Sequence, residues 1–313
     1  RIVAVLVVLV SCSEDKNPTP TPPGAPPTEI AIPGAAVMVG AGDIAVCGTN
    51  GDEATARLVD SVLKTDSAAK IVGAVFTLGD NAYPSGLGGM KGDFQRCFAK
   101  SWGRQRILKV IHPSPGNHDY DTGNAKPYFD YFGARAGPPG KGYYSYDVGA
   151  WHVISLNSEL YFERGSEAEA KAQEDWLRAD LAAHPARCTM AYFHRPLFSS
   201  GTYGATPEVR ALWDILYAGG ADLILNGHEH HYERFLPQTP AGVADSVTGI
   251  EEIISGTGGG QLRKLRSPLA ANPAYQIHGH FGILKLTLGA GDYRRAFIDA
   301  NGRVWDPGGR RCH

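Results

Sequence analysis

The sequence predicts an α/β (α+β) domain built as a four-layer αββα sandwich, in which helices flank two mixed sheets. Three observations predict this fold class. The composition, with 43% hydrophobic and 20% charged residues, is ordinary for a globular protein and argues against extended disorder. From residue 35 onward, short β-branched runs alternate with helical patterns, which indicates parallel strands. The C-terminal third is rich in strand patterns, so we expect two packed sheets in one domain over residues 35–313.

The first part of this domain alternates strands with helices. Apolar runs at 35–43, 71–80 and 107–119 predict strands, and each run ends in a polar motif. Residues 53–63 predict a helix between the first two of these strands.

Two further helices are expected in the second half of the domain. Residues 168–183 predict a helix with Trp176, Leu177 and Leu181 in its buried stripe. Another begins at Thr206-Pro207, where threonine can cap the amides and proline suits the first helical position. Before these helices, residues 143–157 predict a β-hairpin around Gly149-Ala150. After them, strands are expected at 222–231, 250–260, 283–289 and 293–300.

The N-terminal segment predicts export. Residues 2–10 are all apolar, but the run is far shorter than the ~20 residues of a membrane-spanning helix, so residues 1–11 are expected to be a signal peptide. The end of this run resembles a bacterial lipoprotein cleavage box, with Cys12 as the lipid-modified residue; the alternative is a plain signal peptide with an incidental cysteine. Residues 12–34 are rich in Pro and Thr and predict a linker. We expect a periplasmic or cell-envelope lipoprotein or a secreted protein, with membrane contact only through Cys12.

Charge and cysteine content narrow the possible partners. The net charge is −2, from 30 Lys and Arg against 32 Asp and Glu, so no nucleic-acid-binding surface is evident. Four cysteines remain besides Cys12, which suits two disulfides in an oxidising compartment: Cys47, Cys97, Cys188 and Cys312. Three connectivities are possible, and a zinc cluster is the competing interpretation.

Polar clusters follow five of the predicted strands. They are Gly42-Asp43, Gly79-Asp80-Asn81-Ala82-Tyr83, Gly116-Asn117-His118-Asp119, His194 after the run CTMAY, and Gly227-His228-Glu229-His230. Because ligands bind beyond the carboxyl ends of parallel strands, we expect these clusters to converge. Carboxylate, phenolate, amide oxygen and imidazole suit iron, manganese or zinc. A glycine before a ligand lets the backbone approach the site closely. Each motif alone is more often a simple turn or a core histidine, so the prediction depends on their combination.

The order of these motifs resembles the calcineurin-like metallophosphoesterase family and, within it, the purple acid phosphatases. The resemblance extends over about Met38 to Gly260. Ala45 stands where the family usually has a histidine, and Tyr83 stands where the purple branch has its iron-binding tyrosine.

The resemblance implies a two-metal site and its ligands. The first metal would be held by Asp43, Asp80, Tyr83 and His230; Asp80 would bridge to a second metal, which Asn117, His194 and His228 complete. A tyrosinate ligand implies Fe(III) in the first position, with divalent Zn, Fe or Mn in the second. Two cations ~3.5–4 Å apart can clamp a phosphate and lower the pKa of a bound water.

His118 is expected to lie over the substrate and protonate the leaving group, with Asp119 orienting it. The alternative for His118 is a structural role beside the site. The loop 199–205 lacks the histidine that purple acid phosphatases of plants and animals tend to have, and Tyr203 is its only titratable side chain. Residues 256–260 are either a turn or a phosphate nest. Aromatic residues crowd the middle of the chain, and we expect most in the core and some at a pocket: Tyr120, Tyr128, Phe129, Tyr131, Phe132, Tyr143 and Tyr144.

The predicted function is hydrolysis of small-molecule phosphate esters by a metal-bound hydroxide at a dinuclear centre, as in a purple acid phosphatase-like phosphomonoesterase. One alternative keeps the site but hydrolyses phosphodiesters or nucleotides. Another is a catalytically inactive, metal-binding surface lipoprotein.

Overall fold

The computed structural model describes residues 35–68, 73–83 and 92–313. The predicted signal peptide (1–11) and linker (12–34) lie outside the described residues, so both stay predictions. All described residues belong to one unit, Ala31–His313. Among these residues, none of the helices combines the length and the hydrophobicity of a membrane-spanning segment.

The first sheet combines parallel and antiparallel strands. Its strand order is β15-β14-β13-β1-β3-β5. The strands are β1 (Ala36–Ala41), β3 (Gly73–Leu78), β5 (Ile111–Ser114), β13 (Gly282–Leu288), β14 (Asp292–Asp299) and β15 (Val304–Arg311). The β1–β3 and β3–β5 pairs are parallel, as the alternating pattern predicted, whereas β13 pairs with β1 in the antiparallel direction.

The second sheet is also mixed. Its order is β12-β10-β11-β9-β8-β7-β6. The strands are β6 (Tyr144–Val148), β7 (Trp151–Ser155), β8 (Cys188–Tyr192), β9 (Leu223–Asn226), β10 (Tyr232–Phe235), β11 (Glu251–Ser255) and β12 (Pro273–Ile277). Parallel pairing runs from β7 through β8 and β9 to β11, and the predicted hairpin β6–β7 is confirmed at one edge. A separate short pair joins β2 (Ala45–Val46) to β4 (Ala82–Tyr83).

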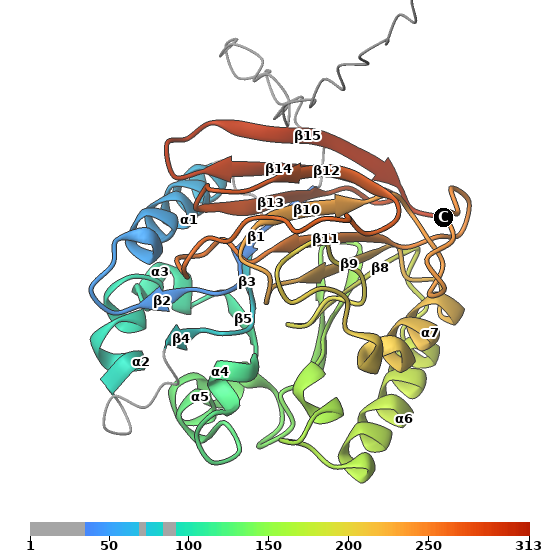
Figure 1. The fold of residues 1–313 in the computed structure, drawn as a ribbon, viewed down its shortest axis with the longest axis horizontal. Helices are drawn as coiled ribbons and strands as arrows, with labels where there is room; N and C mark the ends of the chain where they lie inside the picture. Colours follow the sequence, from blue (N-terminus) through green and yellow to red (C-terminus); the bar gives the residue numbers. More distant parts are fainter. Residues whose placement is uncertain (1–34, 69–72, 84–91) are drawn as a thin grey trace, which may run out of the picture. The chain divides into compact units, whose positions relative to one another are not determined.

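Helices cover the outer faces of the two sheets (Figure 1). On the side of the first sheet lie α1 (Gly51–Ala68), α2 (Gly92–Arg96), α3 (Gln105–Leu108), α4 (Asn117–Tyr120) and α5 (Lys126–Phe132). On the side of the second lie α6 (Glu167–Ala183) and α7 (Arg210–Ala218). The four-layer prediction is therefore confirmed.

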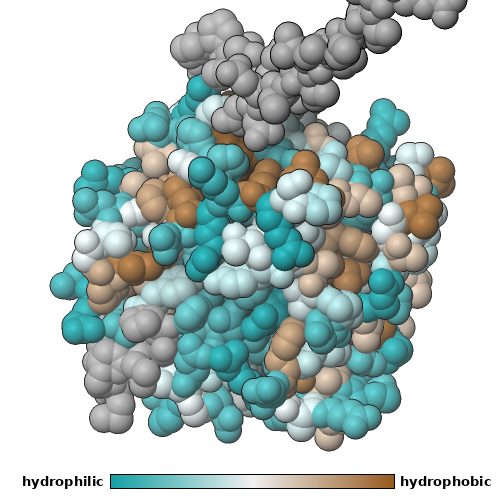
Figure 2. Space-filling model, viewed as in Figure 1, coloured by the Kyte–Doolittle hydropathy of each residue, from teal (hydrophilic) through white to brown (hydrophobic). Residues whose placement is uncertain are grey.

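Strand alternation explains this layering, because successive side chains on a strand point to opposite faces. Phe76 on β3 packs between the sheets with Met190 and Leu225 of the second sheet. Its neighbour Val75 instead packs into the helical layer. Figure 2 shows hydrophilic residues gathered near the centre of the face seen in Figure 1, with apolar residues in scattered patches around them.

Local predictions had mixed outcomes. Helix α6 begins at Glu167, behind a capping box in which Ser166 accepts from the Glu169 amide, and Leu177 is buried as expected. Thr206 does not cap the next helix: its side chain makes no capping bond, and a short 3-10 turn over Pro207–Val209 precedes α7.

The four cysteines form two disulfides, Cys47–Cys97 and Cys188–Cys312. This selects one of the three connectivities, and the competing zinc cluster is wrong because all four sulfurs are paired. The second bridge ties the start of β8 to the C-terminal residues, 124 positions away.

Candidate metal centre

The loops that follow β1, β3, β5, β8 and β9 bring the predicted ligands together. The parallel strands end at the same edge of each sheet, so residues far apart in sequence meet there. All seven predicted ligands take part in two neighbouring clusters: Asp43, Asp80, Tyr83, Asn117, His194, His228 and His230.

The tyrosine cluster comprises Asp43, Tyr83 and His230. The Tyr83 hydroxyl donates to Asp43 Oδ1 at 2.8 Å and lies 3.2 Å from His230 Nε2. His230 Nε2 is also 3.2 Å from Asp43 Oδ1. Asp80 Oδ2 lies 3.0 Å from the same hydroxyl, so four donor atoms face one point.

The histidine cluster comprises Asn117, His194 and His228. His194 Nε2 lies 3.1 Å from Asn117 Oδ1 and 3.2 Å from His228 Nδ1. Asp80 Oδ1 is 3.4 Å from His194 Nε2. Asp80 therefore directs one carboxylate oxygen toward each cluster, which is the arrangement of a bridging ligand.

Hydrogen bonds on the far side of two imidazoles fix their orientation. His194 Nδ1 donates to the Leu78 carbonyl, and His230 Nδ1 donates to the Gln261 carbonyl, both at 2.7 Å. When either ring is neutral, its lone pair then lies on Nε2, which faces the cluster. Metal-binding histidines are oriented in this way.

The glycines before the ligands are needed for close approach. A Cβ atom at Gly116 would overlap Asp80, and one at Gly227 would overlap the Leu78 carbonyl and crowd Asp43. Asp43, Asp80 and His228 themselves have positive φ angles of 58°, 49° and 69°. Such backbone strain in non-glycine residues concentrates at functional sites.

The electrostatics of the clusters fit a bound cation. Burial and the carboxylates of Asp43 and Asp80 raise the pKa of Tyr83 well above its ordinary value. Burial would also raise the pKa of Asp80, but His194 and His118 outweigh it and hold that pKa far below its usual range. Burial lowers the pKa of His194, but the Asp80 carboxylate outweighs it and raises that pKa to about 9, so metal binding there requires loss of this proton. The carboxylates, phenol, amide oxygen and imidazoles form a donor set that suits hard or borderline metal ions, so the residues present fit the two metals that the sequence predicts.

His118 lies beside this centre, as predicted, but its partner differs. Its Nε2 is 4.0 Å from Asp80 Oδ2, and its Nδ1 is 3.2 Å from Asp121 Oδ2. Asp119 does not take the predicted orienting position, because its side chain turns back over the first turn of α4. There Asp119 accepts from the amide of Gly116 and from the amide and side chain of Asn81.

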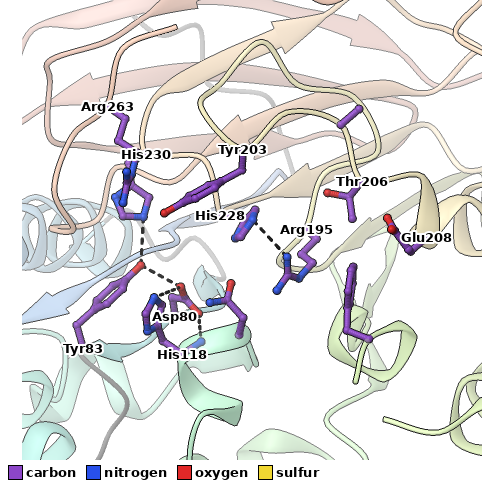
Figure 3. A pocket seen from close by; sticks show the side chains of 13 residues that line it. Asp80, Tyr83, His118, Arg195, Tyr203, Thr206, Glu208, His228, His230 and Arg263 are labelled. Carbon is purple, nitrogen blue, oxygen red and sulfur yellow. Dashed lines mark hydrogen bonds and ion pairs between the residues drawn. The ribbon is translucent and has the colours of Figure 1, made fainter. Parts of the chain in front are cut away.

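A pocket of about 410 Å³ opens over the centre (Figure 3). Among its lining residues, Arg195, Tyr203 and Arg263 were given no role from the sequence. The Tyr203 ring stacks on His228 at 4.8 Å between centroids, and the Arg263 guanidinium lies 4.8 Å from the centroid of that ring. The loop 199–205 thus presents a tyrosine where the resemblance implies a histidine.

The segment that carries Arg195 and Tyr203 is held by three fully buried glutamates, which the sequence did not single out. Glu252 accepts from the amides of residues 197 and 198, Glu233 accepts from that of residue 200, and Glu229 accepts from those of residues 203 and 204. Their positions in the sequence could have pointed to two of these residues, because Arg195 directly follows a predicted ligand and Glu229 lies between two of them.

The structure also decides between the alternatives for two other features. Six of the seven aromatic residues from the middle of the chain belong to the hydrophobic clusters, and the seventh, Tyr144, donates to the Pro113 carbonyl. None of the seven lines the pocket over the centre, whose aromatic walls come from Tyr83, Phe162 and Tyr203, although Tyr143 lines a second, smaller pocket. The segment 256–260 is a turn against the Asp43 loop. Its amides at Gly258 and Gly260 donate to the carbonyls of Gly42 and Asp43, so they do not form a phosphate nest.

Comparison with known proteins gives a family. The family model described as calcineurin-like phosphoesterase matches residues 38–232. Human acid phosphatase type 7 is 30% identical over 208 residues, which cover 56% of this chain and 43% of that protein. Purple acid phosphatase 15 of Arabidopsis thaliana is 30% identical over 132 residues, covering 38% of this chain and 24% of that protein. The chain thus spans less than half the length of these relatives.

Solved structures share the fold. The purple acid phosphatase PPD1 from yellow lupin seeds superposes with a TM-score of 0.67 at 19% identity, over 88% of this chain and 54% of that one. GAP50, the anchor in the inner membrane complex of Plasmodium, superposes with a TM-score of 0.74 at 14% identity, over 89% of each chain. At these identities the likeness concerns the fold alone.

Proposed function

The chain belongs to the calcineurin-like phosphoesterase family, and from that premise we propose that it hydrolyses small-molecule phosphomonoesters at a dinuclear metal centre. The observation that carries the proposal is Asp80, whose two carboxylate oxygens face two separate donor clusters. Acid phosphatases among its relatives support the reaction class.

The seven ligands divide between two ions. Asp43, Tyr83 and His230 would hold the first, and Asn117, His194 and His228 the second, with Asp80 shared. When bound, two such ions clamp a phosphate and lower the pKa of a water molecule. The phenolate of Tyr83 is a hard anion, which supports Fe(III) in the first position and divalent Zn, Fe or Mn in the second.

The pocket residues act on the substrate. His118 is half-exposed and lines the pocket next to Asp80, so it can donate a proton to the leaving oxygen. Its Nδ1 is held by Asp121 at 3.2 Å, which keeps Nε2 directed toward the pocket. The Asp121 carboxylate thus takes the orienting role that the sequence assigned to Asp119.

The reaction is tested by steady-state kinetics on two esters of the same phenol, p-nitrophenyl phosphate and bis(p-nitrophenyl) phosphate. We expect preference for the monoester, loss of activity after chelation, and loss after Asp80→Ala or His228→Ala. A preference for the diester would favour a phosphodiesterase instead, and turnover that survives Asp80→Ala would contradict the dinuclear mechanism.

The identity of the first metal has its own test. Iron-loaded protein should show a visible charge-transfer band, and Tyr83→Phe should remove or shift it. If the band is absent, or is unchanged in Tyr83→Phe, Tyr83 does not bind Fe(III).

Action outside the cytoplasm is part of the proposal. The disulfides Cys47–Cys97 and Cys188–Cys312 support it, because such bridges persist in oxidising compartments. Thiol alkylation in intact cells should leave these cysteines unlabelled, and full labelling would contradict export. The lipid anchor at Cys12 stays a prediction.

A further inference from the structure

Arg195 is a cation anchored in the wall of the pocket. Its Nε and Nη2 donate to the two carboxylate oxygens of Glu159 at 2.8 and 3.2 Å. Its guanidinium also lies 4.1 Å from the centroid of the Phe162 ring. Because Glu159 is fully buried, this paired contact fixes the plane of the guanidinium.

The remaining corner of the guanidinium faces the metal centre. Nη1 carries two N–H groups and lies 3.4 Å from His228 Nε2, farther than either contact to Glu159. With His228 Nδ1 in the histidine cluster as a metal ligand, Nε2 would carry the ring proton and could not accept, so both N–H groups of Nη1 remain for a substrate oxygen. Figure 3 shows Arg195 directed at His228 from the side of the pocket opposite Tyr83. The structure thus presents N–H donors beside the histidine cluster at a fixed position.

We propose that Arg195 makes this site selective for phosphomonoesters over phosphodiesters, by donating from Nη1 to an unesterified phosphoryl oxygen. The inference rests on the proposed function. A monoester has three unesterified oxygens and nearly two negative charges at neutral pH, because its second pKa is about 6. A diester has two such oxygens and one charge. A preorganised guanidinium therefore stabilises the monoester more strongly.

Glu159 and Phe162 are positioning residues for Arg195. Because the Glu159 carboxylate is buried, loss of Arg195 alone would leave it with only the longer contact to Arg164, at 3.8 Å, as an ion-pair partner. Arg263, the other arginine of the pocket, is held differently. It stacks over Tyr203, and its Nε has no hydrogen-bond partner among the described residues, so its donors are not fixed and we assign it no selectivity.

The test compares kcat/KM for p-nitrophenyl phosphate and bis(p-nitrophenyl) phosphate. The main variant is the double substitution Arg195→Gln with Glu159→Gln, which removes both charges together and leaves no buried ion unpaired. We expect the monoester value to fall about 10²- to 10³-fold and the diester value to fall less than about tenfold. The inhibition constant of inorganic phosphate should rise about tenfold or more.

Three further variants make the result specific. Arg195→Lys should retain part of the monoester preference, because lysine keeps the positive charge but lacks the paired N–H donors of the guanidinium. Arg263→Gln should change both substrates by similar factors. Arg178→Gln, on the exposed face of α6, should match the wild type. Metal content and thermal unfolding are measured for each variant. If the double variant does not fold, the monoester-to-diester ratio of Arg195→Lys tests the proposal by itself.

Equal losses on both esters, or an unchanged ratio, would overturn the role of Arg195. That outcome differs from failure of the proposed function, in which the wild-type protein itself would hydrolyse neither ester or would prefer the diester.

Discussion

Asp80 has a strained backbone, a buried carboxylate and contacts to both clusters, so it depends on the residues packed against it. Gly116 is one of them, because a Cβ atom there would overlap Asp80. At the scale of single residues, the position of the Asp80 carboxylate therefore depends on a glycine at position 116 as well as on the ligands themselves.

Gly116→Ala should displace Asp80 and lower metal occupancy without unfolding the domain. We expect at least tenfold weaker binding, in line with the effect of disturbing the residues that support a metal site, about 10- to 100-fold. The measurement is metal content after dialysis against a buffered metal concentration. Gly73→Ala is the control, since its nearest neighbour is the flexible end of Leu63. Equal metal content in both variants would contradict the steric argument.

At the scale of elements, the segment from Arg195 to Thr206 is held in place by buried carboxylates that accept hydrogen bonds from its backbone amides. Glu229 accepts from Tyr203 and Gly204 at 2.7 and 2.6 Å. These bonds hold the aromatic ring against His228, so the wall of the pocket depends on them.

Glu229→Ala should release this part of the segment. Hydrogen exchange at the Tyr203 and Gly204 amides is expected to speed up, because each loses its acceptor. The Ser200 amide is an internal reference, since Glu233 holds it. Unchanged exchange at residues 203 and 204 would show that other contacts fix the segment.

A second element-scale feature joins α6 to the β6–β7 hairpin. His152 Nε2 lies 2.7 Å from Asp180, and its Nδ1 lies 3.2 Å from Asp147. Burial lowers the pKa of His152, but the bonds to these two carboxylates outweigh it and raise that pKa. Burial likewise opposes ionisation of Asp180, yet the bonds from His152 and Ser145 lower its pKa.

The signs of these shifts predict a pH dependence of stability. The contribution of His152 to the free energy of unfolding is complete below its unfolded pKa of about 6.5. This contribution is lost as the pH rises through its higher folded pKa. Asp180 stabilises the folded state above its unfolded pKa of about 3.9, and this stabilisation is lost as the pH falls through its lower folded pKa. Urea unfolding should therefore find His152→Gln less stable than wild type by about 1–3 kcal/mol near pH 5.5. The gap should narrow toward pH 9, and a constant gap would contradict the assignment.

At the scale of the whole molecule, the second disulfide closes most of the second sheet into a loop. It joins Cys188 to Cys312 over 124 positions, whereas Cys47–Cys97 spans 50. The loss of loop-closure entropy in the unfolded chain grows with loop length.

Replacing Cys188 and Cys312 together by alanine should lower the free energy of unfolding by about 2–5 kcal/mol. Replacing Cys47 and Cys97 should cost less, by about 1 kcal/mol, because the loop is shorter. Denaturant unfolding without reductant measures both. A larger loss for the shorter bridge would contradict the entropic account.

Sequence patterns predicted the layers of the fold because strand alternation and the spacing of β-branched runs are local properties. The seven site residues could be found because each follows a strand, and strand ends meet at one edge. The partner of His118 could not be found, since it depends on how α4 turns Asp119 back onto Gly116. The anchoring of Arg195 by Glu159 joins loops that pattern alone does not relate, and the disulfide pairing depends on the same long-range packing.

Metal analysis of the purified protein tests the central claim most directly. We predict two metal ions per chain in the wild type and loss of both in Asp80→Ala, because its carboxylate faces both clusters. One ion or none in fully active wild-type protein, or two ions retained in Asp80→Ala, would contradict the dinuclear centre.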